Sequence, residues 1–113
     1  MKKLAVLMLI LSVAMTAYAE TEKKSKSSEE YIADLSQDRD EKTITEAAEW
    51  AGENQKKEAI DKLAALVTDE RENVRMKAVV ALGYIGDEKG VDAVNSACLN
   101  DQSADVRYAA LLS

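Results

Sequence analysis

The 113-residue chain has no histidine, no proline and no phenylalanine, and it has only one cysteine. Histidine is the commonest general base and a usual zinc ligand, so its absence removes both roles. We therefore expect no catalytic site, no metal site and no cofactor, and a protein that is not an enzyme. A single cysteine forms no internal disulfide. Cys98 continues an apolar stripe, which favours a small buried residue over a reactive thiol.

The first nineteen residues have the three parts of a secretory signal peptide. Two lysines open the chain, Leu4–Ala14 is apolar apart from one serine, and Ala17–Ala19 is a small-x-small cleavage site. An uncleaved membrane anchor is the alternative, but a spanning helix needs about 20 apolar residues and this run is shorter. We expect cleavage after Ala19 and a periplasmic or secreted protein that is free of the membrane after cleavage.

The chain that follows this segment is strongly acidic. Cleavage leaves 94 residues, in which 13 of the 15 basic residues stand against all 21 acidic ones, a net charge of −8. Binding to duplex nucleic acid depends on many contacts between Lys or Arg and phosphate groups. The charge balance therefore argues against nucleic acid as a partner.

The chain divides again near residue 28. Residues 20–28 contain no apolar side chain, so nothing offsets the entropy of ordering them, and we expect a disordered linker. One domain is expected over residues 29–113. Ser27 and Glu30 are three residues apart and fit a capping box, which predicts a first short helix that covers the next segment.

The clearest helical pattern lies in Val74–Gly86. Apolar residues recur there at i, i+4, i+8 and i+11, a spacing that places them on one side of an α-helix. Gly86 is expected to end this helix, because glycine adopts positive φ without steric cost. Similar patterns predict helices in residues 38–52, 55–68, 91–100 and 106–112. The start of the first of them stays open, because Thr43 and Glu46 fit a capping box that would place it as late as Ile44. The residues expected to face inward are Ile44, Ala47, Ala48, Ala51, Ile60, Leu63, Ala64, Val67, Val74, Ala78, Leu82, Ile85, Val91, Val94, Ala97 and Cys98.

Similar residues recur at a spacing of 32 to 34 positions. Trp50 and Tyr84 are 34 residues apart, and Asp69 and Asp101 are 32 apart. A helix–turn–helix unit with this period is typical of an α-solenoid, in which each amphipathic pair completes its core by stacking on the next. The sequence therefore predicts an all-α fold, a short α-solenoid of antiparallel helix pairs with about two and a half repeats.

The central unit carries a recognisable motif. It reads Asp69-x-x-x-x-Val74-Arg75-x-x-Ala78-x-x-Ala81-Leu82-Gly83-x-Ile85-Gly86-Asp87, and its first half recurs as Asp101-x-x-x-x-Val106-Arg107-x-x-Ala110-Leu111. This motif resembles the HEAT repeat, in the short form found in phycobilisome-lyase-type HEAT-like proteins. The resemblance covers roughly residues 38–113. It is weaker in the first unit, where Asp40-Glu41 replaces Val-Arg and Glu49 replaces the glycine that matches Gly83.

The resemblance implies a non-enzymatic scaffold that binds other proteins. A few lyase-type members assist attachment of a bilin chromophore, so an accessory subunit or chromophore-attachment factor is one alternative, and a self-associating structural component of the envelope is another. The resemblance also places the second helix of each pair on the binding face. The expected protein-binding residues are Glu58, Asp61, Lys62, Asp92, Asn95 and Ser96, with an ordinary solvated helix face as the alternative.

Two arginines have equivalent places in the motif. Arg75 and Arg107 each open a helix beside an inward-facing valine. They could form an anion site, or a structural ladder in which each bonds Asp69 or Asp101 and turn carbonyls of the neighbouring unit. Because the resemblance places this pair in the stacking interface, we favour the ladder.

Three further residues stand out in the repeat. Gly83 lies inside a helix at a cost of about 0.5–1 kcal/mol relative to alanine, and we expect close approach of a neighbouring helix as the compensation. Trp50 and Tyr84 are expected to pack between turns rather than to form a binding platform.

The last predicted helix has no second helix behind it. Val106, Ala110 and Leu111 are therefore expected to be left without a covering unit. Three alternatives stay open: the chain is a fragment of a longer product, the last helix is itself a cap, or the open end self-associates with another copy through the C-terminal helix.

Overall fold

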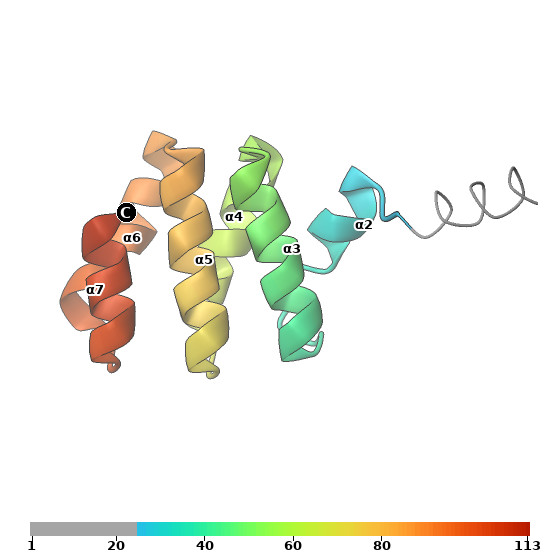
Figure 1. Cartoon of the computed structure of the whole chain (residues 1–113). Helices are drawn as coiled ribbons and strands as arrows, with labels where there is room; N and C mark the ends of the chain where they lie inside the picture. Colours follow the sequence, from blue (N-terminus) through green and yellow to red (C-terminus); the bar gives the residue numbers. More distant parts are fainter. Residues whose placement is uncertain (1–24) are drawn as a thin grey trace, which may run out of the picture.

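A computed structural model describes residues 25–113 of the chain (Figure 1). The predicted signal peptide, and the predicted linker up to residue 24, lie outside the described residues. Ser28, the last residue of that linker, is already helical, and Lys26 pairs with Asp34 at 2.8 Å. Among the helices of the described part, none is long and apolar enough to span a lipid bilayer.

Six α-helices and two short 3-10 helices make up the described residues, which contain no strand. They are α2 (Ser28–Ala33), α3 (Glu41–Glu53), η1 (Lys57–Ala59), α4 (Ile60–Leu66), α5 (Glu72–Ile85), η2 (Glu88–Gly90), α6 (Val91–Asn100) and α7 (Ala104–Leu112). The predicted all-α fold is confirmed. The predicted helix over 55–68 is wrong in detail, because Gln55 turns with a positive φ of 49° and a 3-10 turn precedes α4.

The helices stack as pairs. In Figure 1, α3, α5 and α7 lie side by side in one row, and α4 and α6 lie behind them. The pairs α3–α4 and α5–α6 are two repeats, α7 is the first helix of a third, and α2 lies on the other side of α3. This is the short α-solenoid that the 32- to 34-residue period predicted.

Small and branched apolar side chains form one continuous core through the stack. Its fully buried members of largest volume are Ile44, Leu63, Leu66, Val74, Val79 and Val106. Because each pair is too thin to enclose its own apolar stripe, the core residues of one pair lie against those of the next. Most of the predicted inward residues are buried, while Ala64, Val94 and Cys98 are half-buried.

Two predictions about burial are wrong. Val91 is 48% exposed, because η2 turns the buried Gly90 toward Leu82 and leaves the next side chain outside. Val106 and Ala110 are buried, because α7 packs against both α5 and α6. Only Leu111 of the three residues expected to lack a cover is exposed.

Local sequence signals set most helix ends. Ser27 and Ser103 cap α2 and α7 as predicted, each accepting a hydrogen bond from the backbone N–H three residues on. Gly86 ends α5 with φ 68°, also as predicted. The late start of α3 is wrong: the helix begins at Glu41, and the Thr43 hydroxyl donates to the Asp40 carboxylate before the helix instead of capping it.

The two aromatic residues of the repeat differ from each other. Trp50 packs as expected, stacked on Tyr31 of α2 with the ring centroids 4.6 Å apart. Tyr84 does not pack between turns and is 63% exposed, because within residues 25–113 no aromatic residue from another element covers the end of α5 as Tyr31 covers Trp50. A close approach at Gly83 is confirmed, but its partner is the residue after α7 and not a residue within a neighbouring helix: a Cβ there would lie 2.5 Å from Ser113 Cβ.

Candidate functional site

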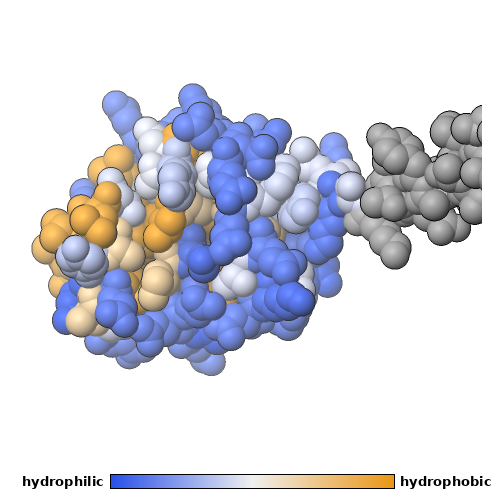
Figure 2. Space-filling model, in the orientation of Figure 1, coloured by the Kyte–Doolittle hydropathy of each residue, from blue (hydrophilic) through white to orange (hydrophobic). Residues whose placement is uncertain are grey.

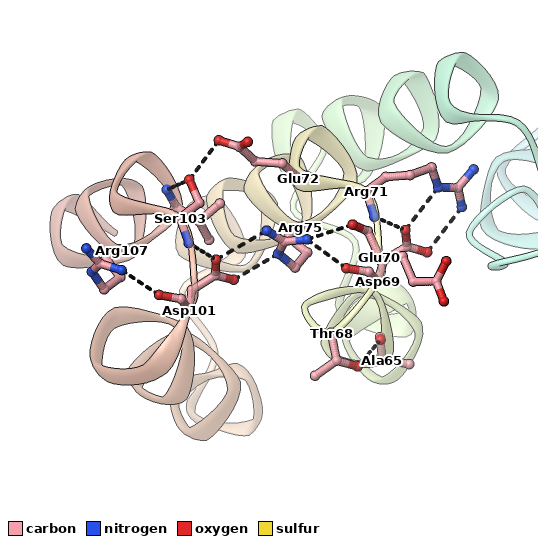
Figure 3. Close-up of polar contacts among 11 residues, drawn as sticks. Ala65, Thr68, Asp69, Glu70, Arg71, Glu72, Arg75, Asp101, Ser103 and Arg107 are labelled. Carbon is pink, nitrogen blue, oxygen red and sulfur yellow. Dashed lines mark hydrogen bonds and ion pairs between the residues drawn. The ribbon is translucent and has the colours of Figure 1, made fainter.

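The turn before α5 is built on Asp69 and Arg71. The Asp69 carboxylate accepts hydrogen bonds from the backbone N–H of Arg71 at 2.9 Å and from its Nε at 2.9 Å. The guanidinium of Arg71 also donates to the carbonyls of Arg39 at 2.8 Å and Gln37 at 3.1 Å, in the segment between α2 and α3. Figure 3 shows the bonds between Arg71 and Asp69. One side chain therefore holds the turn together and also ties it to the start of the preceding repeat.

Arg71 was not anticipated from the sequence. The repeat pattern drew attention to residues that recur, and the position 32 residues after Arg71 is Ser103. Asp69 was expected to pair with Arg75 through its side chain, whereas its carboxylate is taken by Arg71 and only its carbonyl accepts from Arg75. The only sequence signal is the Asp-x-Arg spacing itself, which is short enough for a local pair.

Arg75 crosses from one repeat to the next. Its Nε lies 3.0 Å from Asp101 Oδ2 and its Nη2 lies 3.4 Å from Asp101 Oδ1. Its Nη1 donates to the carbonyls of Asp69 and Glu70, each at 3.0 Å. The side chains of Arg75 and Asp101 are only 6% and 5% exposed. The planar guanidinium thus joins two successive turns, the turn before α5 and the turn before α7, inside the stack (Figure 3).

Arg107 has the equivalent place in the next unit and a different environment. It is exposed, and its Nη1 donates to the backbone carbonyl of Asp101 at 2.6 Å. The turn is otherwise held by Ser103, whose backbone N–H donates to Asp101 Oδ1 at 2.8 Å and whose hydroxyl donates to Glu72 at 2.7 Å. Arg107 therefore closes its own turn without reaching a following repeat.

The polar groups of these turns are occupied by one another. In the described part of the chain, every buried side-chain nitrogen or oxygen has a hydrogen-bond partner. The hydrogen bond from Arg71 holds the pKa of Asp69 below its ordinary value, against the opposing effect of burial. An external anion would have to displace Asp101 from Arg75, so these contacts suit a tie between repeats better than a ligand site.

The predicted protein-binding residues are distributed over η1, α4 and α6. All six, Glu58, Asp61, Lys62, Asp92, Asn95 and Ser96, are exposed. The three residues of α6 follow those of η1 and α4 at a spacing of 34 residues. Because all six belong to the second helix of a pair or to the turn that leads into it, we call them the second-helix strip. Lys62 donates to the carbonyl of Ile32 in α2 at 3.2 Å, which turns the one cation of the strip toward the protein. The remaining charges of the strip, Glu58, Asp61 and Asp92, are acidic.

A second surface was missed by the sequence analysis. The large apolar side chains that the structure leaves exposed are Tyr84, Val91, Leu99, Tyr108, Leu111 and Leu112, all within the last thirty residues. Figure 2 shows apolar atoms gathered over the α7 end of the molecule and hydrophilic ones over α3. Helical periodicity alone did not reveal this, because residue type is alike on covered and uncovered faces.

The acidic residues do not converge on a cation site. Asp38 accepts from the Ser36 hydroxyl at 2.5 Å, Asp40 accepts from Thr43, and Glu49 pairs with Lys77 at 2.6 Å. Across residues 25–113, no three acidic or cysteine side chains come together as metal ligands would. Cys98 is a free, half-buried thiol.

The comparison with known families agrees with this architecture. The family model of HEAT repeats matches residues 28–113, which is most of the chain and all of the stacked helices. No curated protein matches the chain. HEAT repeats commonly mediate protein–protein interaction. From its helix pairs, its repeat period and this match, the chain belongs to the HEAT-repeat family.

Proposed function

We propose that the chain is an exported, non-enzymatic HEAT-repeat module that binds another protein through the second-helix strip. The observation that carries the proposal is the recurrence of exposed polar residues at equivalent places on η1–α4 and on α6. Stacking aligns equivalent residues of successive repeats, which is how solenoid proteins form extended binding surfaces.

The charge of the strip specifies the partner. Glu58, Asp61 and Asp92 are exposed carboxylates, and the ammonium group of Lys62 is directed to a backbone carbonyl. The chain as a whole has a net charge of −6. A partner with a cluster of Lys and Arg side chains would therefore be attracted over a distance and held by complementary charge, with an affinity that falls as salt is raised.

The test uses two variants with the same change in charge. In Asp61→Lys/Asp92→Lys the strip reverses its charge, whereas Glu46→Lys/Glu53→Lys reverses two exposed carboxylates on α3. Proteins crosslinked to each variant and to the original chain in the envelope of the exporting cell are quantified by mass spectrometry. We expect a partner that is recovered with the original chain and the α3 variant, and lost with the strip variant. Equal recovery with all three would refute the strip as the binding surface.

Export has its own test. If the first nineteen residues are a signal peptide, the chain recovered from the periplasm or medium begins at Glu20. A chain that keeps Met1 and stays in the cytosolic fraction would contradict the proposed location without affecting the binding test.

A further inference from the structure

We propose that α2 is a reversible clasp on the second-helix strip, and that its docking raises the affinity of the strip for a basic partner. While α2 is docked, it binds the ammonium group of Lys62, the one cation of the strip. When α2 is released, Lys62 is free to neutralise a carboxylate of the strip. This inference concerns the regulation of the strip and rests on the function proposed for it.

A small number of contacts dock α2 at the end of the row of helices (Figure 1). None of the six residues of α2 is buried, although Tyr31 and Ile32 pack against the core, and Leu35, just after the helix, is buried. Tyr31 stacks on Trp50 of α3. An isolated helix needs about 12–15 residues to be even marginally stable in water. A helix as short as α2 is therefore formed only while these contacts hold it.

The segment that follows α2 is fastened independently of these contacts. The guanidinium of Arg71 donates to the carbonyls of Gln37 at 3.1 Å and Arg39 at 2.8 Å. These bonds join that segment to the turn before α5 and do not depend on the contact between α2 and α3. The short helix can therefore leave the stack by local opening about residues 36–39, without unfolding of the repeats.

One residue of the strip takes part in the docking of α2. Lys62 Nζ, from α4, donates to the carbonyl oxygen of Ile32 at 3.2 Å. Ile32 lies in the last turn of α2, where backbone carbonyls lack their usual partners within the helix. Docked α2 therefore determines where the ammonium group of Lys62 is placed.

Release of α2 gives Lys62 another partner. Glu58 lies four residues before it, in η1, which runs directly into α4. A glutamate followed four residues later by a lysine has the order and spacing that favour an ion pair on a helix. Such a pair would neutralise one of the three carboxylates of the strip, the others being Asp61 and Asp92. The attraction of the strip for a basic partner is therefore weaker when α2 is released.

The coupling acts in both directions. Because docked α2 strengthens the binding of a basic partner, a bound partner stabilises docked α2 by the same factor. The partner does not need to touch α2, since Lys62 carries the effect between them. A basic ligand should therefore slow the opening of α2 in a chain that has Lys62.

The opening of α2 is measured by amide hydrogen exchange, followed by NMR, in the chain spanning residues 20–113, which contains every element that the structure describes. The reporters are the amides of Tyr31 and Asp34, each hydrogen-bonded at 3.1 Å to the carbonyl four residues earlier. We expect them to exchange at least about tenfold faster than the amides of α5, through local opening. Lys62→Met should speed them further without changing α5, whereas the control Lys57→Met, at an exposed lysine of η1, should not. Equal exchange in α2 and α5 would overturn the clasp, because α2 would then open only with the whole stack.

The coupling is measured by adding a decalysine peptide as the basic ligand. At saturation it should slow the exchange of the α2 amides about two- to fivefold in the original chain and in Lys57→Met. It should not slow them in Lys62→Met. The absence of slowing in the original chain, or equal slowing in Lys62→Met, would overturn the proposal. Circular dichroism shows whether each variant is folded, and Lys62→Ala is the substitute if Lys62→Met is not.

Calorimetric titration with the same peptide separates the clasp from the strip. Asp61→Lys/Asp92→Lys should weaken the binding of decalysine more than Glu46→Lys/Glu53→Lys, which makes the same change in charge on α3. Equal weakening by the two variants would refute the strip, and with it any effect of the clasp on binding. Stronger weakening by the strip variant, together with α2 exchange that does not respond to Lys62→Met, would refute the clasp alone.

Discussion

The two repeat junctions of the molecule share an aspartate and a Val-Arg pair, which lie in different surroundings. At the junction before α5, Arg75 is buried and bonds Asp101 of the next turn and two carbonyls of its own turn. At the junction before α7, Arg107 is exposed and bonds one carbonyl. The first helices show the same contrast: Val79 of α5 is fully buried, whereas Leu111 of α7, 32 residues later, is 69% exposed.

This contrast shows that a repeat position specifies a side chain but not its environment. The surroundings of each arginine and each valine or leucine are set by the unit that follows. A residue such as Arg75 therefore contributes to stability only in combination with Asp101, which comes from another pair of helices. Matched residues at the two junctions should therefore differ in how much they contribute to stability.

The largest effect is expected from Arg75→Ala. This change leaves the Asp101 carboxylate buried without its partner, and breaking a buried ion pair in this way costs about 3–5 kcal/mol. Arg107→Ala removes an exposed group with one hydrogen bond and is expected to cost about 1 kcal/mol or less. Urea unfolding at neutral pH measures both. Equal losses for the two variants would contradict the difference between the junctions.

Replacing a glycine inside the stack by alanine should destabilise the fold more than the same replacement near the end of the stack. A Cβ at Gly52 would lie 3.0 Å from the backbone Cα of Ala81, between α3 and α5. A Cβ at Gly83 would meet Ser113, a residue beyond the end of α7 that can shift. We expect Gly52→Ala to lose about 1–3 kcal/mol of unfolding free energy through overpacking. In Gly83→Ala the gain of about 1 kcal/mol in helix propensity should offset most of the strain. A Gly83→Ala variant less stable than Gly52→Ala would reverse this order.

The smallest effect on stability is expected from Asp69→Asn, and it depends on pH. This change acts on the pair of Asp69 and Arg71, which only the junction before α5 has. The Arg71 hydrogen bond lowers the pKa of Asp69 in the folded state. Its contribution to stability is therefore complete above the unfolded pKa of about 3.9 and is lost as the pH falls through the lower folded pKa. We expect the difference in unfolding free energy between the original chain and Asp69→Asn to be constant near neutral pH and to shrink below about pH 4. A difference that grows on acidification would contradict the direction of the shift.

Much of the fold could be predicted from the sequence, because its determinants are local or periodic. The 3.6-residue spacing of apolar side chains gave the helices, the serines at 27 and 103 and Gly86 gave three helix ends, and the period of 32 to 34 residues gave the stacking. These features need no knowledge of which units meet.

The remaining features depend on neighbours that the repeat pattern does not specify. Arg71 has no counterpart in the next unit, so its bonds to Gln37 and Arg39 carbonyls were not foreseen. Val91 was expected inside, but the 3-10 turn before it sets the phase of α6 and places it outside. The exposure of Leu111 likewise follows from the absence of a covering helix in the described stack, not from its residue type.

The most direct test of stacking as the source of stability is amide hydrogen exchange along the chain. In a stack each unit is protected by its neighbours, so α5, which is packed between α3 and α7, should exchange slowest and only through global unfolding. The amides of α7, covered on one side, should exchange faster. Protection in α7 equal to that in α5 would contradict a stack whose burial is set by the following unit.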